Sequence, residues 1–221
     1  MATTKKQDAR ARLQAERAEQ ARRERRVKFV IYGVTGVLVI GLGGMAAWAL
    51  WPKPAAPLPA ASSTLVPPWP VPADSVARAK QVGLEVNQME GTAQHFHVHL
   101  DILDDGKPVT IPANLGIDGT GMSEMHTHDT RGVIHIESPS TGKKYHLGQV
   151  FQVWGLHFAA DGIGGLKTTG GKTLRVFVNG TQVTTDPAAI ELKSHQEIAL
   201  VYGDPAAKTT IPSSYAFQTG E

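Results

Sequence analysis

The chain has 221 residues, with 22 Lys and Arg, 20 Asp and Glu, and no cysteine. The lack of cysteine excludes disulfide bridges, thiolate metal ligands and a cysteine nucleophile. Residues 1–28 carry ten basic and four acidic side chains, a net charge of +6, whereas residues 29–221 carry −4. The larger part of the chain is therefore mildly acidic, which argues against nucleic-acid binding.

Residues 1–28 are rich in Ala, Gln, Glu and Arg. This composition favours a solvated, partly helical tail, and its positive charge favours a position beside anionic lipid headgroups. We interpret residues 1–28 as a basic cytoplasmic tail.

Residues 29–51 contain no charged side chain. A helix of this length, at ~1.5 Å per residue, crosses a hydrocarbon core of ~30 Å with some tilt. A cleaved signal peptide is the alternative, but the apolar run exceeds the ~7–15 residues usual there. We therefore expect a single transmembrane helix. Because the basic residues precede it, we expect the N-terminus in the cytoplasm and the C-terminal domain outside the cell membrane.

Residues 52–72 include eight prolines among 21 residues. Such a stretch is typical of a semi-rigid linker that holds a domain away from the bilayer. The remaining residues, 73–221, are enough for one hydrophobic core without disulfide bridges. We expect them to form a single extracytoplasmic domain rich in histidine.

The pattern of this domain predicts several strands and two short helices. Asp74 and Ser75 are expected to cap the first helix, and Gly83 to end it. The expected helices are 76–82 and 147–154. The expected strands are 95–103, 109–111, two strands flanking 129–132, 173–178, 181–184 and 197–202. The glycine-rich stretch 161–171 is expected to be a loop. The predicted fold class is α+β, mainly β: one compact exported β-sheet domain with two short helices, preceded by the transmembrane helix.

Residues 95–100 have the sequence His-Phe-His-Val-His-Leu. This is the two-residue period of a half-buried strand, so Phe96, Val98 and Leu100 should enter the core while the three histidines line the other face.

A second group of histidines lies at 126, 128 and 135. If residues 129–132 form a four-residue hairpin loop, His126 faces His135, and all three histidines share one sheet face. A slip of one residue would send His135 to the opposite face.

Clustered imidazoles on strands are typical of a transition-metal site. Residues i and i+4 of a strand are ~13 Å apart, too far for His95 and His99 to share one ion readily. A single site therefore takes either His95 with His97 or His97 with His99, and further ligands from another strand. We expect one ion, held by a subset of six candidate ligands: His95, His97, His99, His126, His128 and His135. Nearby acidic residues would orient the rings, namely Asp101, Asp129 and Glu137.

Nitrogen ligands suit copper, zinc and nickel alike. The Irving–Williams order favours copper over zinc for a site exposed to both. Met122 and Met125 are possible soft ligands for Cu(I), although methionines at such positions more often serve packing. We therefore expect copper, or zinc, as the cofactor. Three other histidines are expected to be structural or on the surface: His146, His157 and His195. Of these three, His157 is the first candidate for an additional ligand.

At these residues the chain resembles a bacterial family of single-pass, envelope-exposed domains that is common in actinobacteria. The family shows an HxHxHL strand, a G-K/Q-P-V hairpin, an LHTHD motif and a GxIHIESP strand. The matches are residues 95–100, 106–109, 126–129 and 132–139, and the resemblance extends over about 92–202. It implies that the histidines belong together, but it implies no particular reaction, since that family has no settled activity.

Three functions fit these patterns. The first is a membrane-tethered metal-binding protein for metal handling or for an envelope complex, and under this interpretation we do not expect an enzyme. The second is a zinc enzyme of carbonic-anhydrase or hydrolase type, since residues 94–97, Gln-His-Phe-His, superficially resemble the FHxH strand of α-type carbonic anhydrases. The third is a metal-free interaction module of an envelope protein complex, with polar or pH-sensing histidines. The expected partners are the metal ion, the membrane through the N-terminal helix, and such a complex, but not nucleic acid.

Overall fold

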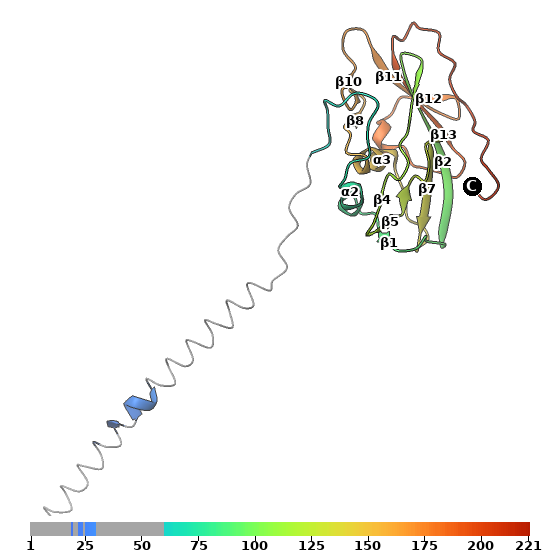
Figure 1. Cartoon of the computed structure of the whole chain (residues 1–221). Coiled ribbons are helices and arrows are strands. Elements are labelled where there is room, and N and C mark those ends of the chain that lie inside the picture. The colour runs from blue at the N-terminus through green and yellow to red at the C-terminus, as the bar shows by residue number, and fades with distance from the viewer. Residues whose placement is uncertain (1–18, 20–21, 24, 30–59) are drawn as a thin grey trace, which may run out of the picture. The chain divides into compact units, whose positions relative to one another are not determined.

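The computed structural model describes residues 19, 22–23, 25–29 and 60–221 (Figure 1). The chain divides into two compact units, residues 1–56 and 57–221. The few described residues of the first unit are helical, and all strands of the described residues belong to the second. Apart from Phe29, the predicted transmembrane segment lies outside the described residues. Within the described part of the chain, no helix has both the length and the apolar character that crossing a bilayer requires.

The second unit is built on a seven-stranded mixed sheet. Its strands follow the order β12-β11-β13-β2-β7-β6, and β3 also pairs with β2. All neighbours are antiparallel except β13 and β2, which run parallel. The bounds are β2 Gln94–Asp104, β3 Lys107–Val109, β6 Met125–His126, β7 Val133–Ser138, β11 Thr173–Val178, β12 Thr181–Val183 and β13 Glu197–Gly203.

Smaller elements complete the unit. Two three-stranded sheets have the orders β1-β5-β4 and β10-β9-β8. Their strands are β1 Val86–Asn87, β4 Ile117–Asp118, β5 Gly121–Ser123, β8 Phe158–Ala159, β9 Gly162–Ile163 and β10 Leu166–Lys167. The helices of this unit are α2 Ser75–Gln81, α3 Leu147–Val153 and the 3-10 turn η1 Pro187–Ala189.

The two faces of β2 have different surroundings, as its alternating sequence predicts. Val98, Leu100 and Ile102 are at most 1% exposed and belong to the main hydrophobic core. The same core takes alternate residues of the neighbouring strands and the buried faces of both helices, among them Ile134, Ile198 and Phe151. β2 is thus anchored from one side by most of the apolar core.

The opposite face of the sheet carries the histidines and a second, smaller apolar cluster. That cluster consists of Leu103, Phe177, Ala199 and Val201, with Ile211 packed against it. Further along the same C-terminal segment, the ring of Tyr215 stacks on that of His99 at 3.8 Å between centroids. His97 and His99 are buried on this face, whereas His95 is partly exposed.

Most predicted elements are confirmed at their expected positions, and the mainly β class with few short helices is confirmed with them. Two details differ. Asp74 occupies the N-cap position of α2, but its carboxylate accepts a hydrogen bond from Arg78 Nε at 2.8 Å instead of capping a backbone amide. The stretch 161–171 is not simply a loop: the paired glycines Gly164 and Gly165 make a tight turn between β9 and β10.

Residues 60–72, part of the predicted linker, pack against the domain. Trp69 is 2% exposed and meets Trp154 edge to face at 5.7 Å between ring centroids. Its indole N–H donates to the Leu65 carbonyl at 2.8 Å, and the Leu65 carbonyl also accepts from the Gly165 amide. A side chain at Gly164 would meet the same carbonyl at 2.7 Å, so glycine is what allows this approach. The proline-rich stretch therefore contributes to the core.

Truncation of Trp69 should strongly destabilise the domain. Trp69→Ala in the fragment 57–221 should lower its free energy of unfolding by about 3–5 kcal/mol, because it removes a buried aromatic side chain. Urea denaturation followed by circular dichroism measures this. Val66→Ala is the matched control, since Val66 is 59% exposed and its truncation should change stability by less than about 0.5 kcal/mol. A fragment 73–221 as stable as 57–221 would contradict the assignment of residues 60–72 to the core.

Candidate metal centre

Three adjacent strands place three histidines in one row. His97 of β2 lies opposite His135 of β7, and His135 lies opposite His126 of β6. Directly opposite residues of antiparallel strands have Cβ atoms about 4.5–5.5 Å apart and point to the same face. The four-residue-loop register predicted for residues 129–132 is therefore confirmed. Figure 1 shows β2 and β7 side by side in the sheet.

Glycine and an ion pair hold the hairpin loop in this register. Gly132 has φ of +88°, and a Cβ there would lie 2.6 Å from the Leu100 carbonyl oxygen. Its own carbonyl accepts from the Leu100 amide at 2.9 Å. Arg131 donates to Asp129 at 2.8 Å and to Glu221 at 2.5 Å. The loop is thereby fixed both to β2 and to the C-terminal segment.

Four side chains converge beside this row. The donor atoms of one group all lie within 4.8 Å of one another, and its members are His126, His128, His135 and Glu137. Nε2 of His126 is 3.2 Å from Nε2 of His128 and 3.8 Å from Oε2 of Glu137. Ligands of a tetrahedral ion at 2.0–2.1 Å are about 3.3 Å apart. The spacing therefore fits a transition-metal ion with nitrogen and oxygen ligands.

His126 has the orientation expected of a ligand. Its Nδ1 lies 2.7 Å from the Ser123 carbonyl oxygen, which can only accept, so Nδ1 carries the proton. Nε2 is then the unprotonated nitrogen, and it points to His128 and Glu137. Metal-binding histidines commonly donate their other N–H to a backbone carbonyl in this way. Burial is the main cause that lowers the pKa of His126 to about 4, so the ring is neutral at pH 7.

His97 is also held neutral. Burial first, and then the neighbouring rings of His135 and His95, lower its pKa to about 4. Nε2 of His97 is 3.0 Å from Nδ1 of His135 and 3.3 Å from Nε2 of His95. Neutral imidazoles are the form in which histidine binds metal ions.

Glu137 is a buried carboxylate with one unsatisfied oxygen. Oε1 is 3.3 Å from Nδ1 of His135, whereas Oε2 has no hydrogen-bond partner among the described residues. Burial alone would raise the pKa of Glu137, but the hydrogen bond with His135 and the electrostatic influence of the nearby imidazoles bring it below the usual value. A buried acceptor without a partner costs about 1–3 kcal/mol, and more when it is charged. A bound cation would remove this cost.

His99 belongs to a different group. Its Nε2 donates to the Arg131 carbonyl at 2.7 Å, and its Nδ1 is 2.7 Å from Oε2 of Glu197. Burial lowers the pKa of His99, but the hydrogen bond and charge of Glu197 outweigh burial and raise it overall. The donor atoms of His99, Asp101 and Glu197 lie within 4.8 Å of one another. Because both nitrogens of His99 already have partners, His99 is held apart from the cluster around Glu137.

Five of the six candidate ligands thus surround Glu137, and whether they bind metal stays a prediction. Glu137 was expected only to orient a ring, although its place two residues after His135 already put it on the same strand face. Glu197 was not anticipated: it pairs with His99 through parallel strands 98 residues apart in sequence. No local sequence pattern predicts such a pairing.

Side chains outside the cluster have other roles. Met125 is 2% exposed and belongs to the main hydrophobic core, on the side of β6 opposite His126. It is therefore a packing residue. His157 pairs with Asp161 at 2.7 Å, and His195 contacts the backbone carbonyl of Glu221 at 3.0 Å. Neither histidine joins a metal-binding group of the described residues.

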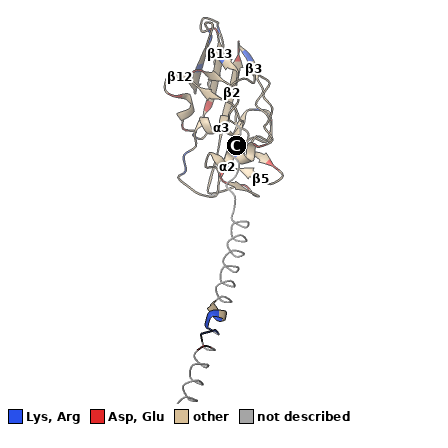
Figure 2. Cartoon of the chain, turned by 90° about the vertical axis from the view of Figure 1, so that its left-hand side faces the viewer, with Lys and Arg blue, Asp and Glu red and all other residues tan. Residues whose placement is uncertain are grey.

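Acidic side chains surround the cluster. Residues 60–221 hold eleven Lys and Arg against sixteen Asp and Glu, interspersed along the ribbon (Figure 2). Glu90 Oε1 lies 4.0 Å from Nε2 of His128, and His135 is among the groups that lower the pKa of Asp129 and of Glu221. Such surroundings favour a cation over an anionic ligand.

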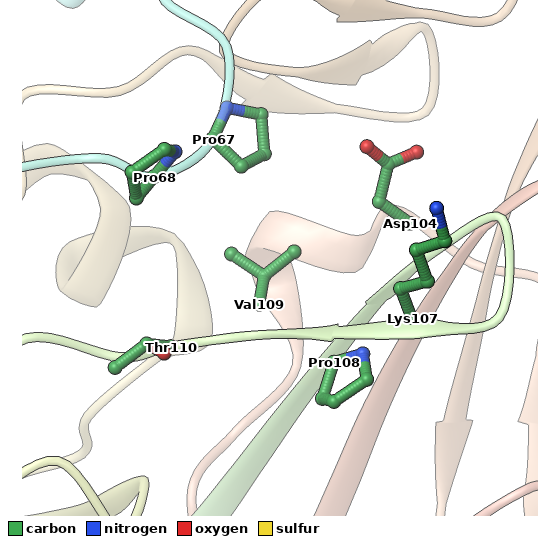
Figure 3. A pocket seen from close by; sticks show the side chains of 7 residues that line it. All are labelled: Pro67, Pro68, Asp104, Lys107, Pro108, Val109 and Thr110. Atoms are coloured by element: carbon green, nitrogen blue, oxygen red, sulfur yellow. The ribbon is translucent and has the colours of Figure 1, made fainter.

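A pocket of about 250 Å³ lies at the other end of β2 (Figure 3). Pro67 and Pro68 face the β2–β3 hairpin across it, and Asp104 and Lys107 are its only charged lining residues. Asp104 is five residues beyond His99, about 16 Å along the strand. The pocket contains no histidine and is separate from the cluster.

Comparison of the chain with protein-family models, with curated proteins and with solved structures finds no match. The family resemblance inferred from the motifs therefore stays a prediction. Function has to be inferred from the chemistry of the site.

The buried neutral histidines should make the metal-free domain sensitive to acid. A pKa of about 4 in the folded state, against about 6.5 in the unfolded chain, means that the unfolded chain takes up the proton first. Stability is then fully present above pH 6.5 and falls as the pH drops toward 4, by about 1.4 kcal/mol per pH unit for each such group. His126→Gln should reduce this slope between pH 6.5 and 4.5.

Urea denaturation of the fragment 57–221 in EDTA, at several pH values, measures the slope. His157→Gln is the control, because His157 lies on the surface beside Asp161, and it should leave the slope unchanged. An unaltered slope in His126→Gln would show that His126 is not held neutral by burial.

Proposed function

We propose that this protein is a membrane-tethered metal-binding protein whose extracytoplasmic domain holds a divalent transition-metal ion, copper before zinc. The ligands are His126, His128, His135 and Glu137. The buried, unpartnered oxygen of Glu137 among neutral imidazoles is the observation that carries the proposal, because a cation supplies what that oxygen lacks.

The chemistry of the ligands supports Cu(II) or Zn(II). Three nitrogens and one carboxylate oxygen suit either ion, and the Irving–Williams order places Cu(II) first. The chain has no cysteine, and Met125 packs in the core, so neither supplies a soft ligand that would select Cu(I). The proposed role is metal handling at the envelope or within an envelope protein complex.

The sequence supports the proposed membrane anchor. Residues 29–51 have no charge, and ten basic side chains precede or border them within residues 1–28. This distribution favours a single-pass protein with the N-terminus in the cytoplasm and the domain outside.

Removal of one proposed ligand should weaken metal binding sharply. His126→Ala should lower the affinity for Cu(II) and Zn(II) by more than the roughly 10–100-fold that loss of an outer-shell partner costs, because it leaves a coordination position unfilled. Isothermal titration calorimetry of the fragment 57–221 measures the affinity. His157→Ala is the matched control and should bind like the wild type. Equal affinity in all three proteins, or no binding, would favour the metal-free interaction module.

The topology is tested separately. Protease added to intact spheroplasts should degrade the part of the chain after Pro52 and spare residues 1–28, because the basic flank is retained on the cytoplasmic side. Antibodies against each end detect the fragments, and lysed spheroplasts serve as the control in which both parts are degraded. Protection of the C-terminal domain in intact spheroplasts would contradict the orientation.

A further inference from the structure

The cluster has more ligands than one ion uses. Beside the four proposed ligands, a second group of donor atoms lies within 4.8 Å of one another, formed by His95, His97 and Glu137. Nε2 of His95 is 3.3 Å from Nε2 of His97 and 3.5 Å from Oε1 of Glu137. These separations again match ligands of one ion, which are about 3.3 Å apart in a tetrahedral site.

The two groups are separate at their outer ends. Two ligands of one ion, each at 2.0–2.1 Å, are at most about 4.2 Å apart. The groups adjoin at His97 and His135, where Nε2 of His97 is 3.0 Å from Nδ1 of His135. Among the described residues, no group of mutually close donor atoms combines the histidines of β2 with His126 or His128.

Glu137 is the residue shared by both groups, and its two oxygens face different partners. Oε1 lies 3.5 Å from His95 of β2 and 3.3 Å from Nδ1 of His135 on β7, whereas Oε2 lies 3.8 Å from His126 of β6. Glu137 sits on β7, the strand between them, directly opposite His95. A carboxylate in this position can give one oxygen to each of two ions, as bridging carboxylates do in sites whose ions are about 3.5–4 Å apart.

We propose that the protein binds two divalent transition-metal ions in a dinuclear centre bridged by Glu137. His126, His128 and His135 hold the first ion, and His95 and His97 hold the second. The inference rests on the proposed function for the first ion and adds the second. The rings of His95 and His128 are each 42% exposed, so the centre is open to solvent beside both ions.

The number of ions that the full chain binds, and the magnetic coupling between two bound Cu(II) ions, test this proposal. The protein, without an affinity tag and in detergent, is titrated with Cu(II), and binding is followed by calorimetry and electron paramagnetic resonance. The wild type should bind two equivalents. The first should give the spectrum of an isolated Cu(II), and the second should convert it to that of a coupled pair, because the two ions share one carboxylate.

His95→Ala should bind one equivalent and give only the isolated spectrum. Because the His95 ring is partly exposed, this variant should retain the fold. Glu137→Gln keeps the size of the side chain but weakens the bridge, so the coupled spectrum should be lost and the second equivalent should bind at least tenfold more weakly. The matched control His157→Ala should retain two equivalents and the coupled spectrum.

The outcomes separate the two proposals. One equivalent in the wild type, unchanged in His95→Ala, would overturn the second ion and leave the proposed function intact. Two equivalents with only isolated spectra would overturn the bridge. No equivalent in the wild type would overturn the proposed function together with the dinuclear centre.

Discussion

The strict alternation of β2 couples the hydrophobic core to the histidine cluster. One face of this strand carries Val98, Leu100 and Ile102 into the core, and the other carries His95, His97 and His99. Because the side-chain period of a strand is two, the histidines cannot shift by one residue without sending the apolar side chains to the opposite face. The free energy of apolar burial therefore fixes where the imidazoles lie. Because β7 pairs with β2 and β6 pairs with β7, the registers of the three strands are linked.

The buried polar groups of the cluster lower the stability of the metal-free folded state. His97, His126 and Glu137 are buried polar groups, and an uncharged ring or an unpartnered carboxylate oxygen in such a place has lost favourable contacts with water. Proteins retain such groups mainly at functional sites, where a ligand supplies the missing partner. A ligand that binds only the folded state adds stability in proportion to the logarithm of its concentration relative to its dissociation constant, so metal binding and folding would support one another here.

The C-terminal segment is the second structural support of the cluster. Glu221 pairs with Arg131 of the hairpin loop, and Tyr215 stacks on His99. These contacts join residues 90 or more positions apart, and they lie on the face that the core leaves uncovered. They hold the loop that follows His128. Together with the apolar contacts of Ile211 they cover part of the sheet face, and His95 and His128 stay partly exposed.

Local patterns were sufficient to predict much of this protein. Period-two alternation and turn residues predicted the strands, and the loop at residues 129–132 predicted that His126 faces His135. What the sequence could not supply were contacts between distant segments: the parallel pairing of β13 with β2 that gives His99 the partner Glu197, and the packing of Trp69 on Trp154. The sequence by itself determined which side chains share a strand face, because that follows from backbone geometry over two residues. Only the tertiary structure decided that Glu137 lies between two sets of imidazoles and that His99 is held apart, because these depend on which strands become neighbours in the sheet.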